Sequence, residues 1–168
     1  MKKTLLFVVA ALFSILVQSQ EMSVFSIDRV STEGYNVGDI IDVPVYFDDL
    51  SQPIALFQIF FEFDHSVLEY VETKDINPAF DDGWRDNHTP DFYAVVFLDM
   101  NKKGKIEKQL GKVCTLSFKY LGGDTDIKWG TKDEFVEKVK KMGVTKYIAV
   151  DNSTPEVRLI DGCVCSNP

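Results

Sequence analysis

The hydrophobic pattern of the chain is clearest in residues 38–72. Apolar residues occupy every second position in two runs, one ending at Phe47 and the other at Phe63. A strand with one buried face has this period of two, because successive side chains point to opposite faces of a sheet. The segment therefore predicts two adjacent strands, and a shorter apolar run around Leu68 predicts a third.

Further strand signals follow along the chain, separated by turn residues. They are expected at residues 23–30, 92–98, 111–121, 125–129, 146–150 and 157–165, whereas residues 77–91 are rich in Asp, Asn, Pro and Gly and predict a loop. Many short strands with frequent turns are typical of an all-β fold. We expect a two-sheet antiparallel β-sandwich.

One segment departs from this pattern. Thr131 and Glu134 have the spacing of a capping box, and the apolar residues that follow recur at helical intervals up to Met142. Gly143 stands where a helix would stop. The pattern predicts one inserted helix near residues 131–142.

The N-terminus has the features of a targeting segment. Lys2 and Lys3 precede a thirteen-residue apolar run from Leu5 to Val17, which is short of the roughly 20 residues that span a bilayer. This predicts a signal peptide over residues 1–19, cleaved near Ser19. The remaining residues 20–168 predict a single exported domain, periplasmic or extracellular, without membrane insertion.

Charge narrows the possible partners. The formal net charge of −8 becomes −10 once Lys2 and Lys3 are removed. Nucleic acids and anionic lipids require a basic surface, so neither is expected as a partner. Cationic, calcium-bearing and neutral partners stay open.

The three cysteines are Cys114, Cys163 and Cys165. The last two point the same way along one predicted strand, so we do not expect them to bond to each other. A bridge from Cys114 to either of them stays open. A zinc site at this pair would need further soft ligands, and the chain has only two histidines. No metal or cofactor is predicted.

Two acidic segments invite a calcium interpretation. Residues 99–110 partly match a calcium-binding loop, but Lys103 occupies a ligand position and Leu110 replaces the bidentate acid. A hairpin that turns at Gly104 is the expected structure. Residues 80–88 could hold calcium, could use Trp84 to stack on a sugar, or could be a solvated loop.

Catalysis has little support in the sequence. There is no Ser-centred nucleophile elbow and no His-rich metal motif. Acidic pairs such as Asp48 and Asp49 are expected to face solvent at turns. We do not expect an enzyme.

A stronger indication of function lies on the outward side of the aromatic strand that ends at Phe63. If Phe57, Ile59 and Phe61 face the core, the outward residues are Leu56, Gln58, Phe60 and Glu62. Two apolar side chains among polar ones are typical of a protein-binding surface. Alternatively, the predicted helix or a loop covers this face.

Several of these features occur together in one known family. They are the Gly38-Asp39 opening, the Val43-Pro44-Val45 strand, the long aromatic strand and Phe63-Asp64 followed by Val67-Leu68-Glu69. Similar pieces recur at residues 111–119 and 159–164. In this order the motifs resemble the cohesin family over nearly the whole mature chain.

The resemblance implies a jelly-roll sandwich of about nine strands, related to cellulose-binding modules. It implies a secreted, non-catalytic module for extracellular polysaccharide-degrading assemblies, whose partner is a dockerin-like or other protein. The partner would dock on a flat sheet face at Leu56 and Gln58, where typical cohesins have Asn and Asp, with Val96 and Leu98 beside them. The more apolar residues here predict a more hydrophobic partner. The alternative is a carbohydrate-binding module that holds a polysaccharide at Trp84.

Overall fold

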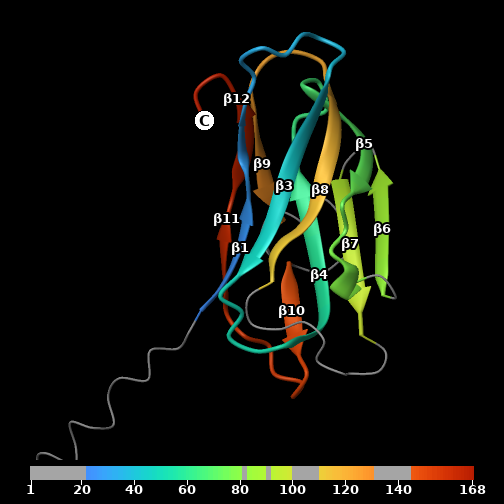
Figure 1. Cartoon of the computed structure of the whole chain (residues 1–168), viewed down its shortest axis with the longest axis vertical. Helices are drawn as coiled ribbons and strands as arrows, with labels where there is room; N and C mark the ends of the chain where they lie inside the picture. Colours follow the sequence, from blue (N-terminus) through green and yellow to red (C-terminus); the bar gives the residue numbers. More distant parts are fainter. Residues whose placement is uncertain (1–21, 81–82, 90–91, 100–109, 131–144) are drawn as a thin grey trace, which may run out of the picture.

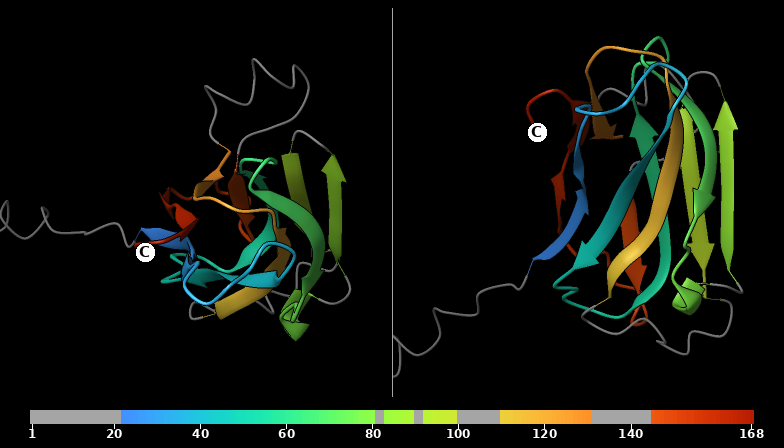
Figure 2. Two further views of the ribbon diagram at one scale, coloured as in Figure 1. Left: turned by 90° about the horizontal axis from the view of Figure 1, so that it is seen from above. Right: turned by 45° about the horizontal axis from the view of Figure 1, so that its top comes forward.

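The strands of the protein form two sheets that face each other across a hydrophobic core (Figures 1 and 2). The computed structural model describes residues 22–80, 83–89, 92–99, 110–130 and 145–168. The helical element in this part of the chain is the short 3-10 turn η1 (Pro78–Phe80). No helix among the described residues is long and apolar enough to cross a membrane.

The strand order confirms the predicted sandwich. The first sheet has five strands in the order β11 (Val157–Ile160), β1 (Ser23–Ile27), β3 (Ile40–Asp48), β8 (Gly111–Tyr120) and β5 (Leu68–Lys74). The second follows the order β2 (Arg29–Ser31), β12 (Gly162–Cys165), β9 (Thr125–Trp129), β4 (Ile54–Glu62), β7 (Phe92–Leu98) and β6 (Trp84–Thr89), and β10 (Lys146–Ala149) also pairs with β4.

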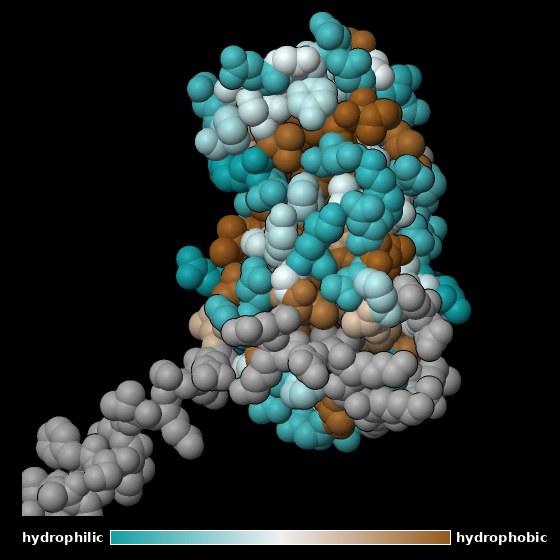
Figure 3. All heavy atoms as spheres, viewed as in Figure 1, coloured by the Kyte–Doolittle hydropathy of each residue, from teal (hydrophilic) through white to brown (hydrophobic). Residues whose placement is uncertain are grey.

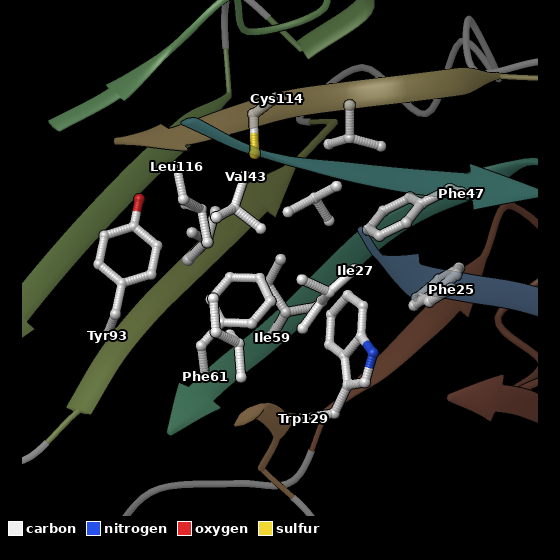
Figure 4. Packing of buried hydrophobic residues seen from close by; sticks show 14 of the residues in the cluster. Phe25, Ile27, Val43, Phe47, Ile59, Phe61, Tyr93, Cys114, Leu116 and Trp129 are labelled. Carbon is white, nitrogen blue, oxygen red and sulfur yellow. The ribbon is translucent and has the colours of Figure 1, made fainter. Parts of the chain in front are cut away.

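The core follows from the alternation read in the sequence. Every second residue of β3, ending at Phe47, is fully buried, and β4 contributes Phe57, Ile59 and Phe61 from the facing sheet. Figure 4 shows Val43, Phe47, Ile59 and Phe61 pointing into the space between the sheets. Phe25 stacks on Phe47 with ring centroids 3.7 Å apart. Because each such side chain contributes about 1.5–3 kcal/mol on burial, the two inner faces hold the sandwich together.

Two of the expected strands divide between the sheets. The first breaks at Asp28 into β1 and β2, and the last breaks at Asp161 into β11 and β12. The halves run side by side in parallel, β1 with β11 and β2 with β12, so the sandwich is not purely antiparallel as predicted. The crossing point is tight, because a Cβ on Gly162 would lie 2.3 Å from the carbonyl oxygen of Asp28. Residue 162 must therefore be glycine.

β9 and β10 occupy one strand position alongside β4. Trp129 pairs with Phe61 in β9, and the pairing resumes at Gln58 in β10. Between them, Gly130 N–H donates to the Phe60 carbonyl at 2.8 Å and Thr145 N–H donates to the Gly130 carbonyl at 3.2 Å. The chain thus leaves and re-enters the sheet opposite Phe60. The predicted helix near 131–142 lies outside the described residues, as does most of the predicted hairpin around Gly104.

Part of the predicted loop at 77–91 is strand. Residues of β6 pair antiparallel with β7 from Trp84 to Thr89. The sequence suggested a loop because β6 is polar on both faces, yet β6 is an edge strand, and edge strands tolerate charged residues on either face.

The disulfide expectation is also wrong. Cys163 and Cys165 form a disulfide, and Cys114 is a buried free thiol. Residues two apart in an extended strand are separated by about 6.6 Å, but the Cα atoms of this pair are 5.6 Å apart. That separation lies within the range usual for disulfides.

Candidate protein-binding face

The outward residues of four neighbouring strands form three cross-strand rows, which we call the β4–β7 face. The first row consists of aliphatic residues. The third row lies beside Gly130, where the chain leaves the sheet. By register, the rows are Ile148, Leu56 and Leu98; then Lys146, Gln58, Val96 and Arg85; then Phe60, Ala94 and Asn87.

Solvent reaches the first two rows. Leu98 is 41% exposed and Val96 is 38% exposed, while Leu56 and Gln58 are half-buried. These four predicted site residues are therefore neighbours on adjacent strands. A cluster of aliphatic side chains on an otherwise flat sheet face has the composition of a protein-binding surface. Sequence reasoning did not identify Ile148 or Arg85, because only the strand register brings them to this face.

Phe60 does not belong to the accessible surface. The sequence predicted it beside Leu56 in an exposed patch, but the side chain is only 1% exposed. Its N–H donates to Thr145 Oγ1 at 3.3 Å and its carbonyl accepts from Gly130. The departing and returning chain meets the sheet here, so Phe60 cannot serve as a contact in this conformation. Glu62, the last predicted residue, is half-buried and pairs in register with Lys128.

Trp84 is part of the core. It lies opposite Phe97 in the inward register of β6 and is 7% exposed. Its ring packs edge-on against Phe57 at 5.7 Å and tilts against Phe80 at 6.0 Å. The predicted sugar platform is therefore absent at Trp84, because stacking on a sugar requires an exposed aromatic face.

A buried hydroxyl cluster positions β10 at the margin of the β4–β7 face. The Tyr147 hydroxyl lies 2.7 Å from Ser23 Oγ and 3.0 Å from Ser51 Oγ. The Ser51 N–H also donates to Ser23 Oγ at 2.9 Å. Tyr147 points inward while its neighbour Ile148 lies on the outward face, so this cluster fixes the strand that carries Ile148. The three residues lie far apart in sequence, and no local signal predicts their contact.

The opposite sheet presents a face on which several charges are paired with each other. Lys74 Nζ lies 2.8 Å from Asp42 Oδ2, and Ser117 Oγ donates to Asp42 Oδ1 at 2.7 Å. Burial opposes ionisation of Asp42, but the hydrogen bonds from Lys74 and Ser117 outweigh it and lower the pKa of the carboxyl group. Figure 3 views the molecule from this side and shows hydrophilic residues interleaved with hydrophobic ones.

A polar cluster closes the open side of the sandwich between β5 and β6. The hydroxyls of Tyr70 and Tyr93 each donate to Asp86 Oδ2 at 3.4 Å. Burial raises the pKa of both tyrosines, so their hydroxyls stay protonated as donors. Asp86 points inward from an edge strand, an arrangement that discourages edge-to-edge association. In the described part of the chain, no three His, Cys, Asp or Glu side chains converge on a metal-binding position.

The fold is that of a β-sandwich module, and its β4–β7 face is the candidate binding surface. The sequence model of the cohesin domain family matches residues 24–153, most of the chain. The chain therefore belongs to the cohesin domain family, and the resemblance noted in its motifs is confirmed. No curated protein shows significant similarity to it.

Solved cohesins share the fold. The sixth cohesin of Acetivibrio cellulolyticus scaffoldin B, in complex with a Cel5 dockerin mutant, superposes with a TM-score of 0.68 at 19% identity, covering 86% of this chain and 98% of that one. The OlpA cohesin of Clostridium thermocellum, in complex with a dockerin, gives 0.66 at 18%, with 85% and 97% covered. A non-cellulosomal cohesin from the archaeon Archaeoglobus fulgidus gives 0.64 at 13%, with 85% and 89% covered.

Proposed function

We propose that this chain is an exported, non-catalytic cohesin module that binds a dockerin-type protein through the β4–β7 face. The observation that carries the proposal is the aliphatic row of Ile148, Leu56 and Leu98, open to solvent beside Val96. Membership of the cohesin family supports the binding role, since two of the similar structures are cohesin–dockerin complexes.

Export is proposed from the signal peptide at residues 1–19, and an extracellular polysaccharide-degrading assembly is the proposed setting. One similar cohesin is described as non-cellulosomal, so the family also has members outside such assemblies. The alternative of a carbohydrate-binding module loses its basis, because Trp84 lies in the core.

A pull-down with dockerin modules from the source organism tests the proposal. Leu56→Asp places a charge in the middle of the aliphatic row, and we expect it to weaken retention of the dockerin at least about tenfold, since a buried unpaired carboxylate costs more than 1.4 kcal/mol. Its melting temperature should stay within about 4 °C of the parent, because the site is on the surface.

The chain offers a matched control pair. Leu98 in β7 and Ile160 in β11 are 41% and 38% exposed, on opposite sheets. Leu98→Asp should weaken binding as Leu56→Asp does, whereas Ile160→Asp should leave binding intact. Full retention by both Leu56→Asp and Leu98→Asp would show that the β4–β7 face is not the docking site.

A further inference from the structure

The second row of the β4–β7 face has a cationic residue at each end. In register order it reads Lys146 on β10, Gln58 on β4, Val96 on β7 and Arg85 on β6. None of the residues in the three rows is Asp or Glu. The whole sequence has a net charge of −8, so the residues at these register positions differ from it in the sign of their formal charge.

Arg85 is available to a partner. It is exposed, and its guanidinium donates one hydrogen bond to the carbonyl of its neighbour Trp84. Among the described residues no carboxylate lies within ion-pair distance of Arg85, whereas Lys74 and Lys112 on the opposite sheet are paired with Asp42 and Asp75. A guanidinium has five donors in a planar fork, so most of the binding capacity of Arg85 is unused.

The dimensions of the row suit one secondary-structure element. Adjacent strands lie about 4.8 Å apart, so the two ends of a four-strand row are separated by roughly 14 Å. An α-helix with its side chains is about 10–12 Å wide. A helix lying along β4 and β7 would cover Leu56, Leu98 and Val96 with its underside, and one of its flanks would lie over β6 beside Arg85.

The one acidic residue of β4 does not change this charge pattern. Glu62 lies one row beyond Phe60 and faces Lys128 in register. Lys128 in turn lies 3.7 Å from Asp126, at the far end of the face. The rest of the acidic protein repels an acidic partner, but this repulsion is screened beyond about 8 Å at physiological salt. The charges at the contact therefore decide whether an acidic or a basic partner binds better.

We propose that the β4–β7 face selects a partner helix whose aliphatic stripe is flanked by Asp or Glu on the side that faces β6. This proposal rests on the proposed function, and it specifies the chemistry of the partner. The aliphatic row supplies most of the affinity, and Arg85 selects the sign of the flanking charge.

Three helical peptides of about 20 residues test this selection. They share one leucine stripe and differ only at the flanking positions, which are all Glu, all Gln or all Lys. Fluorescence anisotropy with the mature chain should show the Glu peptide binding about five- to tenfold tighter than the Lys peptide at low salt, and the difference should shrink at high salt.

Variants assign the effect to the face. Arg85→Glu should abolish or reverse the preference for the Glu peptide. Arg158→Glu, the same charge change on an exposed residue of β11 in the other sheet, should leave it unchanged. Equal binding of the three peptides, tighter binding of the Lys peptide, no binding of any peptide, or an equal effect of both variants would each overturn the proposal.

The two proposals fail in different ways. If Leu56→Asp weakens binding of all three peptides while the flanking charge has no effect, the docking face stands and the acidic-partner inference falls. If Leu56→Asp leaves binding unchanged, the face itself is misassigned and the proposed function falls with it.

Discussion

The hydroxyl of Tyr147 lies 2.7 Å from the hydroxyl of Ser23, across the interior of the sandwich. Both residues are fully buried, and they join β10 of one sheet to β1 of the other. Removing the hydroxyl with Tyr147→Phe leaves Ser23 and Ser51 to satisfy each other at 3.3 Å. We expect the free energy of unfolding to fall by about 1 kcal/mol, because one net hydrogen bond is lost, as measured by urea denaturation.

Tyr46→Phe is the matched control. Tyr46 lies half-buried on the outward side of β3, so the loss of its hydroxyl should change stability by less than about 0.5 kcal/mol. Equal stability of the Tyr147→Phe variant and the parent protein would show that the hydroxyl cluster does not stabilise the docking of β10.

Gly162 should be sensitive to the smallest substitution. A Cβ there would lie 2.3 Å from the Asp28 carbonyl oxygen and 2.6 Å from Ile27 Cγ2, both at the crossing where β1 becomes β2. Backbone must move to accept Gly162→Ala, so we expect a loss of about 2–3 kcal/mol. Differential scanning calorimetry would record this as a markedly lower melting temperature.

Gly34 provides the contrasting glycine. It has a φ of 90° and nothing within 4 Å of a built Cβ. Gly34→Asn should therefore cost no more than about 1 kcal/mol, because asparagine tolerates positive φ. A Gly162→Ala variant as stable as Gly34→Asn would mean that the crossing is looser than the structure shows.

Thiol reactivity tests the burial of Cys114 and the disulfide between Cys163 and Cys165. Cys114 is buried, and burial raises the pKa of its thiol to about 12. At mildly alkaline pH it should therefore be protonated and unreactive toward a thiol reagent while the protein is folded. Under denaturing, non-reducing conditions the protein should release a single reactive thiol, because Cys163 and Cys165 are bonded to each other. Three reactive thiols would show that this disulfide is absent.

The sequence predicted most of the fold because a strand with one buried face has apolar residues at every second position. The inward positions of β3, β4 and β8 carry apolar residues at every second place in the sequence, and the structure buries these residues. The sequence did not predict strand β6, because β6 lacks this alternation. Its one deeply buried aromatic, Trp84, is surrounded in sequence by charged and polar residues, so no period of two was visible.

The candidate face was predicted in part. The alternation of β4 correctly separated Leu56 and Gln58 from the core, and Val96 and Leu98 are their register partners on β7. The same alternation placed Phe60 on this side, but its side chain is buried, and its backbone bonds to Gly130 and Thr145. Alternation tells which side of a sheet a residue faces, and it does not tell what else lies on that side.

The sequence by itself determined the sandwich, the family and the strand that carries the candidate site, because these depend on patterns between near neighbours in the chain. Tertiary structure decided which further residues share the β4–β7 face with the four that the sequence predicted. Ile148 and Arg85 lie more than sixty residues apart, and strand pairing brings them to the same surface. Pairing depends on the packing of the whole core, so no local pattern could have placed an aliphatic row and Arg85 side by side.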